Sequence, residues 1–135
     1  MAVRIRYKAE IVVSSSSAEE KDLGNQKYEV ANDEQNEGGS WKTVLAAAAT
    51  NVVLNLGNVA LARFISIRTS AKDPTLTPGI VRIRLGDIGA DEVGIQPMGT
   101  SKEGLMILTC EDVDSIYASN PGSVIMDVIV SAAGD

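Results

Sequence analysis

The residues best suited to chemistry in this sequence are acids gathered in two turn-rich segments. They are Asp87, Asp91 and Glu92 in the first segment, and Glu111, Asp112 and Asp114 in the second. Calcium takes six to eight oxygen ligands, and two acids about 5 to 10 Å apart hydrolyse glycosides. Neither segment has the spacing of an EF-hand loop, and acids in turns are ordinarily solvated. We therefore expect solvated turns rather than a calcium site or a glycosidase.

The sequence lacks the residues and spacings that other common catalytic sites require. The chain has no histidine, so it has neither a Ser-His-Asp nor a Cys-His arrangement, and a zinc site is implausible. Its single cysteine, Cys110, follows the apolar pair Ile107 and Leu108, which predicts a buried thiol. No segment has the spacing of a glycine-rich phosphate loop. We expect a protein that is not an enzyme and that has no cofactor or metal.

Charge is unevenly distributed along the 135 residues, whose net charge is −6. A basic segment comes first and an acidic one follows, and the two could meet each other or a neighbouring copy. The predicted partner-contact residues are Arg4, Arg6, Lys8, Glu19, Glu20, Asp22, Glu29, Asp33, Glu34 and Glu37. Net negative charge disfavours nucleic acid as a partner. No apolar run approaches the ~18 residues that cross a bilayer, so we expect no membrane partner and no signal peptide.

Period-two alternation is the main structural signal. It predicts strands at 3–11, 41–45, 50–56, 63–68, 80–85, 104–108 and 124–130. Segment 111–117 is ambiguous, and we favour a turn followed by a short strand. Asn120–Ser123 has the composition of a tight turn. Segment 14–39 is predicted to be a polar, acidic loop, with one weak strand around Tyr28 and a helical turn that begins at a capping box over 17–20 and ends at Gly24.

Eight to ten short strands predict one all-β domain, a jelly-roll-like antiparallel β-sandwich with an extended acidic N-terminal loop or arm. Its expected parts are a first strand over 1–13, the acidic loop or arm over 14–39, and the main sandwich over 40–135. The strand at 124–130 is apolar on nearly both faces, which favours a central position in a sheet. Trp41 and Phe64 are expected in the core. All six arginines fall in predicted strands.

Five segments carry a resemblance to a known class of proteins. They are Thr50–Gly57, Ala62–Arg68, Gly104–Leu108, Ile116–Ser123 and Val128–Gly134. From Trp41 onward the chain resembles small virion proteins of tailed bacteriophages, notably β-sandwich capsid decoration (cement) proteins. The resemblance implies a protein that is made in the host cytoplasm, binds the outer capsid surface and stabilises the head.

Its implied partners are the major capsid protein and copies of itself, in a virion that holds many copies. The alternatives are a tail or head–tail component of the same fold, a carbohydrate-binding module with aromatic side chains in a groove, and, third, a small hydrolase.

Overall fold

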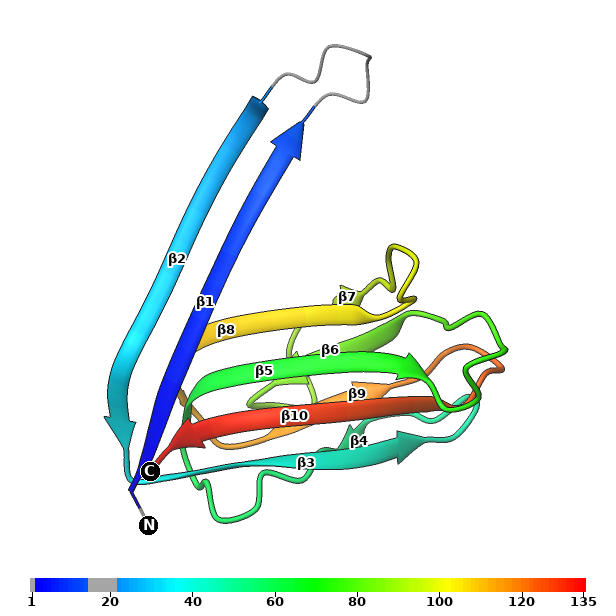
Figure 1. The fold of residues 1–135 in the computed structure, drawn as a ribbon. Coiled ribbons are helices and arrows are strands. Elements are labelled where there is room, and N and C mark those ends of the chain that lie inside the picture. The colour runs from blue at the N-terminus through cyan, green and yellow to red at the C-terminus, as the bar shows by residue number, and fades with distance from the viewer. Residues whose placement is uncertain (1, 15–21) are drawn as a thin grey trace.

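The protein is built from strands and the turns that join them (Figure 1). The computed structural model describes residues 2–14 and 22–135. In chain order the strands are β1 (Val3–Ser14), β2 (Asp22–Gln35), β3 (Glu37–Leu45), β4 (Val52–Val53), β5 (Ala62–Ala71), β6 (Val81–Leu85), β7 (Val93–Ile95), β8 (Gly104–Val113), β9 (Ile116–Ser119) and β10 (Met126–Gly134). These residues contain no helix, which confirms the all-β prediction, and hence no helix that could span a bilayer.

Eight of the strands form two facing four-stranded sheets, in the orders β3-β10-β5-β8 and β4-β9-β6-β7 (Figure 1). All of their pairings are antiparallel, so the predicted antiparallel β-sandwich is confirmed. The pairing is nested: β3 lies beside β10, β4 beside β9, β5 beside β8, and β6 beside β7. The chain therefore runs out through four strands and returns beside each of them in reverse order.

The core lies between the two sheets and follows the alternation of the strands. Along β10, alternate side chains from Met126 to Ala132 are buried, and the side chains between them face outward. β10 lies between β3 and β5, as its apolar composition predicted. The opposite sheet contributes Val81, Ile83, Ile95, Ile116 and Ala118 to the same cluster. Burial of these aliphatic side chains is the main source of stability of the sandwich.

The segment from Thr50 to Leu56 departs from prediction, because only Val52 and Val53 form a strand. Asn51 has a positive φ of 49° and Gly57 one of 57°, so the backbone leaves the extended region on both sides. Leu54 and Leu56 are nevertheless buried in the core. The alternation correctly identified which side chains point inward, but turns limited the pairing.

The hairpin of β1 and β2, here called the arm, forms a sheet of its own and projects from one end of the sandwich (Figure 1). Segment 14–39 was predicted to be a loop or arm with one weak strand around Tyr28; that strand is present but much longer, since β2 covers Asp22–Gln35, and β3 begins at Glu37, so the loop prediction is wrong for these residues. Gly24 lies within β2 rather than at the end of a helix, and the capping box over 17–20 lies outside the described residues. Pairing with β1 stabilises a strand whose own composition has little β-propensity.

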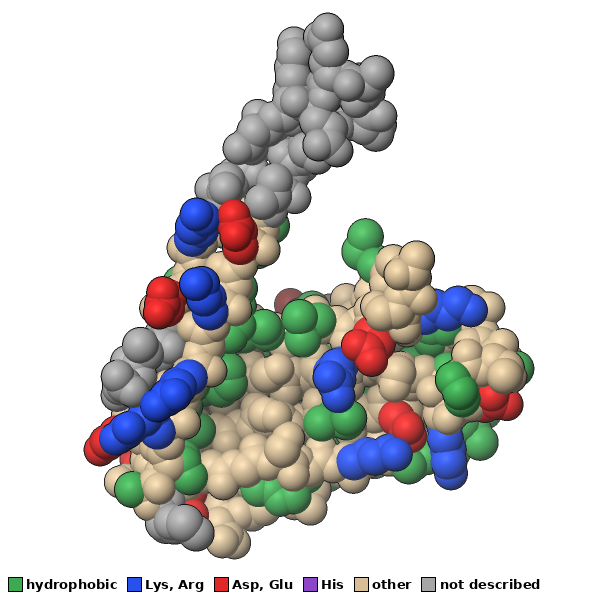
Figure 2. Space-filling view, in the orientation of Figure 1, with side chains coloured by type: hydrophobic (Ala, Val, Ile, Leu, Met, Phe, Trp, Pro, Cys, Tyr) green, Lys and Arg blue, Asp and Glu red, His purple; other side chains and the backbone are tan. Residues whose placement is uncertain are grey.

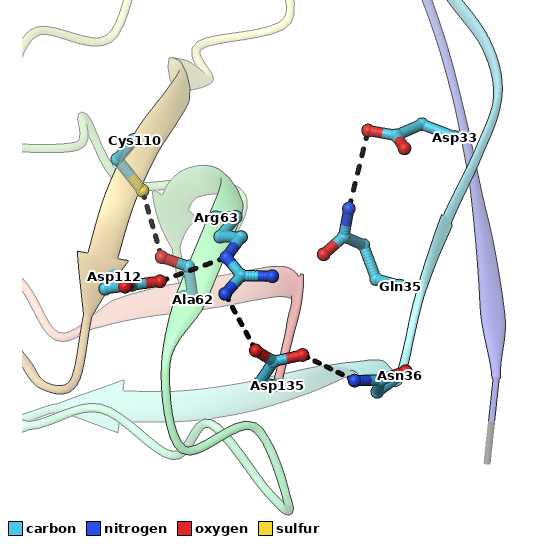
Figure 3. Close-up of polar contacts among 8 residues, drawn as sticks. All are labelled: Asp33, Gln35, Asn36, Ala62, Arg63, Cys110, Asp112 and Asp135. Atoms are coloured by element: carbon cyan, nitrogen blue, oxygen red, sulfur yellow. Dashed lines mark hydrogen bonds and ion pairs between the residues drawn. The ribbon is translucent and has the colours of Figure 1, made fainter.

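A polar cluster joins the base of the arm to the sandwich at Asn36, the residue between β2 and β3 (Figure 3). The Asn36 amide Nδ2 donates to Asp135 Oδ1 at 2.6 Å. Arg63 donates through Nη2 to Asp135 Oδ2 at 2.7 Å and through Nε to Asp112 Oδ1 at 3.0 Å. The two carboxylates raise the pKa of Arg63, chiefly through the hydrogen bond to Asp112. The cluster links β5, β8 and the chain after β10 to the start of the arm.

Candidate protein-binding surface

The predicted basic and acidic segments meet each other in the arm. β1 pairs with β2 so that Arg4 lies opposite Glu34, and Lys8 opposite Glu29. Arg4 Nη2 lies 3.0 Å from Glu34 Oε1 in a solvent-exposed ion pair. The structure thus brings together four of the ten predicted contact residues as cross-strand neighbours.

The other predicted contact residues lie around this pair of strands. Arg6 sits in β1 at an irregularity of the register, and Asp33 in β2 accepts a long hydrogen bond of 3.5 Å from Gln35. Glu37 begins β3, beyond the arm. Asp22 begins β2, and Glu19 and Glu20 lie outside the described residues.

The arm has a charged face and an apolar face, as strand alternation requires. Along β1, Arg4, Arg6 and Lys8 are exposed, while Ile5 between them is buried. The apolar face continues toward the tip with Ile11, which is 58% exposed, and across to Tyr28 of β2, which is 50% exposed. Figure 2 shows hydrophobic side chains gathered where the arm meets the sandwich, with charged side chains along the face of the arm turned to the viewer.

The apolar face of the arm lines a groove against the outer surface of the β3-β10-β5-β8 sheet. On the arm side the groove is lined by Tyr7, Ile11 and Tyr28, and on the sheet side by Phe64, Ile107 and Thr109. It comprises two adjoining hollows of about 240 Å³ and 160 Å³, the larger at the base. The groove is mainly apolar and open to solvent, with Asp33, Gln35 and Arg63 at the edge of the larger hollow.

Three aromatic rings meet in this groove. The ring centroid of Tyr7 lies 5.7 Å from that of Tyr28 and 6.1 Å from that of Phe64, both pairs in tilted arrangements. Such pairs stabilise by about 0.5 to 1.5 kcal/mol beyond their burial. The expectation that Phe64 lies in the core is wrong, because its side chain is on the outer face of β5, whereas Trp41 packs against the core. This cluster was not predicted from the sequence; its signal there was Tyr7 at an apolar position of β1 and Tyr28 near the middle of β2.

The two acidic segments are engaged in local contacts. Glu92 lies 2.5 Å from Arg84 Nη2 and 3.6 Å from Arg82 Nη1, and Asp87 accepts the backbone N–H of Gly89 at 2.9 Å. In the second segment, Asp112 binds Arg63. Within the described part of the chain, no group of three or more possible metal ligands comes together. Asp87 thus closes a turn, and Glu92 and Asp112 pair with arginines. All six arginines lie in strands, as predicted.

The thiol of Cys110 is a further group whose chemistry the fold determines. It is partly buried and donates to the carbonyl oxygen of Ala62 at 3.3 Å. Burial raises the pKa of the Cys110 thiol, and this outweighs the lowering effect of a backbone hydrogen bond from Val113.

We predict that Cys110 reacts slowly with iodoacetamide at pH 8 in the folded protein, and much faster in guanidinium chloride, because the thiolate is the reactive form. The raised pKa also makes a contribution to stability. This contribution is complete below the ordinary pKa of a thiol and is lost as the pH rises from there through the folded pKa. Alkylation rates test the reactivity of the thiol, and urea midpoints from pH 7 to 10 test its contribution to stability, with Cys110→Ala as the control. Equal alkylation rates in the folded and denatured protein would refute the prediction.

The fold and this surface together define an all-β sandwich that carries a projecting β-hairpin with an apolar groove at its base. Comparisons of the chain with protein-family models, with curated proteins and with solved structures find no significant match.

Proposed function

We propose that this protein is a non-enzymatic virion structural protein of a tailed phage that binds the outer capsid surface and stabilises the head. The observation that carries the proposal is the arm, which projects from the sandwich (Figure 1) and whose apolar face is exposed at Ile11 and Tyr28. In this proposal the arm and its groove contact a subunit of the capsid. The chemistry of the acidic segments supports binding rather than catalysis, since Asp87 closes a turn and Glu92 and Asp112 form ion pairs.

The exposed apolar side chains favour a protein partner. Ile11 and Tyr28 lie on the same face of the arm, and at least half of each residue is exposed to solvent. Contiguous apolar surface of this kind marks interaction sites in soluble proteins. Tyrosine is also enriched among the residues that dominate binding energy. A partner that covers this face would remove apolar area from water at about 25 cal/mol per Å².

The architecture supports the virion part of the proposal by analogy. The nested pairing among strands β3 to β10 supports the jelly-roll part of the proposal, and jelly rolls are frequent in viral capsid and lectin domains. Fold analogy alone does not establish function. A decoration protein also benefits from repetition, because many weak contacts on a symmetric particle add up to tight attachment. Net negative charge suits a position away from packaged DNA.

The test is binding to phage heads that lack the protein. We expect the protein to co-sediment with such heads and to raise their resistance to heat and low salt. The variant Ile11→Ser/Tyr28→Ser is expected to bind about 10 to 100 times more weakly, since each buried apolar side chain contributes about 1 kcal/mol or more. Sedimentation with increasing protein concentration measures this difference.

The matched control is Val53→Ser, which removes a side chain that is 61% exposed in β4, on the sheet away from the groove. This variant should bind as the wild type does. The proposal fails if heads stay bare at all concentrations, or if both variants bind equally. Binding to isolated tails or connectors, with heads bare, would instead indicate a tail or head–tail component.

The aromatic cluster specifically favours a second candidate, a carbohydrate-binding module. Tyr7, Tyr28 and Phe64 lie together in an open groove, where aromatic faces can stack on sugar rings. A glycan array distinguishes the two functions. Strong glycan signals that Tyr28→Ala abolishes, together with bare heads, would favour this candidate over capsid binding.

A further inference from the structure

We propose that the arms of neighbouring copies of this chain pair edge to edge, with β1 of one copy antiparallel to β2 of the next, in a head-to-tail contact. This inference deepens the proposed function, on which it rests only in taking the arm as the binding element. Each edge of the arm is bound by the arm of another copy of this chain.

Both edges of the arm are unpaired among the described residues. β1 and β2 pair with each other and with no strand of the sandwich. The edges of such a two-stranded sheet present rows of backbone N–H and C=O groups that a further strand can satisfy. A two-stranded hairpin alone is only marginally stable in water, so addition of strands would stabilise the arm.

The two edges carry opposite charge. β1 has Arg4, Arg6 and Lys8 against Glu10. On the same face, the described charged side chains of β2 are Glu29 and Glu34 against Lys27. Two copies that met β1 to β1 would bring like charges together, and so would a β2-to-β2 contact. A β1-to-β2 contact instead brings basic residues beside acidic ones, and it is therefore the favoured arrangement.

The register within the arm makes this contact repeatable. Lys8 lies level with Glu29, Arg4 with Glu34, and Glu10 with Lys27. If copies are related by rotation about an axis parallel to the arm, residues at equal height meet. Lys8 of one copy then faces Glu29 of the next, and each charge has an opposite charge on both sides. Such a heterologous contact closes into a ring when the rotation closes.

The shape of the molecule permits the arrangement. The arm stands away from the sandwich, so that several arms can converge on one axis while the sandwiches lie outside it (Figure 1). In this arrangement the apolar face of each arm, with Ile11 and Tyr28, stays turned toward the sandwich of its own copy.

The test is a charge-swapped variant, Arg4→Glu/Lys8→Glu/Glu29→Lys/Glu34→Lys. It keeps the net charge and the cross-strand pairs inside each arm, so the hairpin itself should be preserved. We expect it to form the same oligomer as the wild type. When the two proteins are mixed, we expect them to sort, because basic β1 would face a now basic β2. Native mass spectrometry with one protein isotopically labelled should show mixed contacts about tenfold below the statistical share.

The matched control swaps an ion pair on the sandwich, Lys42→Asp/Asp127→Lys, whose charges lie 3.1 Å apart. This variant should mix with the wild type statistically. If the arm variant also mixes statistically with the wild type, the proposal is overturned. If the two proteins prefer each other, the proposal is likewise overturned, and contacts between like edges (β1 to β1 and β2 to β2) are indicated. A wild type that stays monomeric up to about 100 μM would also overturn it.

A second pair of variants keeps the test decisive if the fourfold variant fails to fold. Lys8→Glu and Glu29→Lys should each oligomerise poorly alone, and their mixture should recover mixed oligomers; no recovery would overturn the proposal. Head binding is measured separately. Sorting without head binding would refute only the proposed function, and head binding by monomers would refute only the edge pairing.

Discussion

Replacing Asn120 by alanine is expected to lower the free energy of unfolding by about 3 kcal/mol, or the melting temperature by about 10 °C. Asn120 is 0% exposed in the connection between β9 and β10. Its side-chain Nδ2 donates to the carbonyls of Ala46 at 3.0 Å and Val124 at 2.7 Å, with a longer bond of 3.4 Å to Leu45. Alanine would leave these buried acceptors without their donor, which costs more than the bonds contribute when made.

The same side chain also shapes its own turn, because Asn120 Oδ1 accepts the backbone N–H of Gly122 at 3.2 Å. Urea unfolding followed by circular dichroism measures the loss. The control is Ser123→Ala, an exposed substitution in the same turn, which should change stability by no more than about 0.5 kcal/mol. An Asn120→Ala protein with an unchanged urea midpoint would show that the connection does not depend on this side chain.

Alanine at Gly134 is expected to destabilise the protein by about 2 to 3 kcal/mol. Gly134 ends β10 opposite Ala62 of β5, where the two backbones approach closely. A Cβ at this position would overlap the carbonyl oxygen of Leu61 and lie 3.0 Å from the Cα of Ala62. Because both of these are backbone atoms, relief requires the end of the β5–β10 pair to separate.

Gly79→Ala is the matched control for this substitution. A Cβ at Gly79 would meet nothing within 4 Å, and the residue does not have a positive φ. We expect Gly79→Ala to be neutral or to stabilise by up to about 1 kcal/mol, since it restricts the unfolded chain. Comparable melting temperatures for the two variants, measured by differential scanning calorimetry, would contradict the steric argument.

Local alternation predicted much of the sandwich. The strands around 3–11, 63–68, 80–85 and 124–130 appear where the period-two pattern places them, and β10 is central, as expected of a strand that is apolar on both faces. Alternation is a property of neighbouring residues, so it is visible in the sequence whatever the strand pairs with. The same signal overestimated the segment from Thr50 to Leu56, where positive φ angles at the two flanks, and not composition, limit the pairing.

The arm shows where local patterns stop being informative. Segment 22–35 is polar, acidic and weak in β-propensity, and its residues alone predict a loop. It becomes a strand because β1 offers opposite charges at matching heights and, in Tyr7, an aromatic ring diagonally opposite Tyr28. The gain comes from pairs such as Lys8 with Glu29, which lie on different strands. A reading of β2 alone omits that energy.

The sequence by itself determined the all-β class, the inward-facing residues of the main strands, the placement of every arginine in a strand, and the separation of basic from acidic segments. Only the tertiary structure decided that those segments lie side by side in a projecting arm, and that Tyr7, Tyr28 and Phe64 share one groove. The physical reason is the distance along the chain over which the deciding interactions act. Strand alternation is fixed by adjacent residues, whereas pairing and register depend on contacts between residues far apart in the chain.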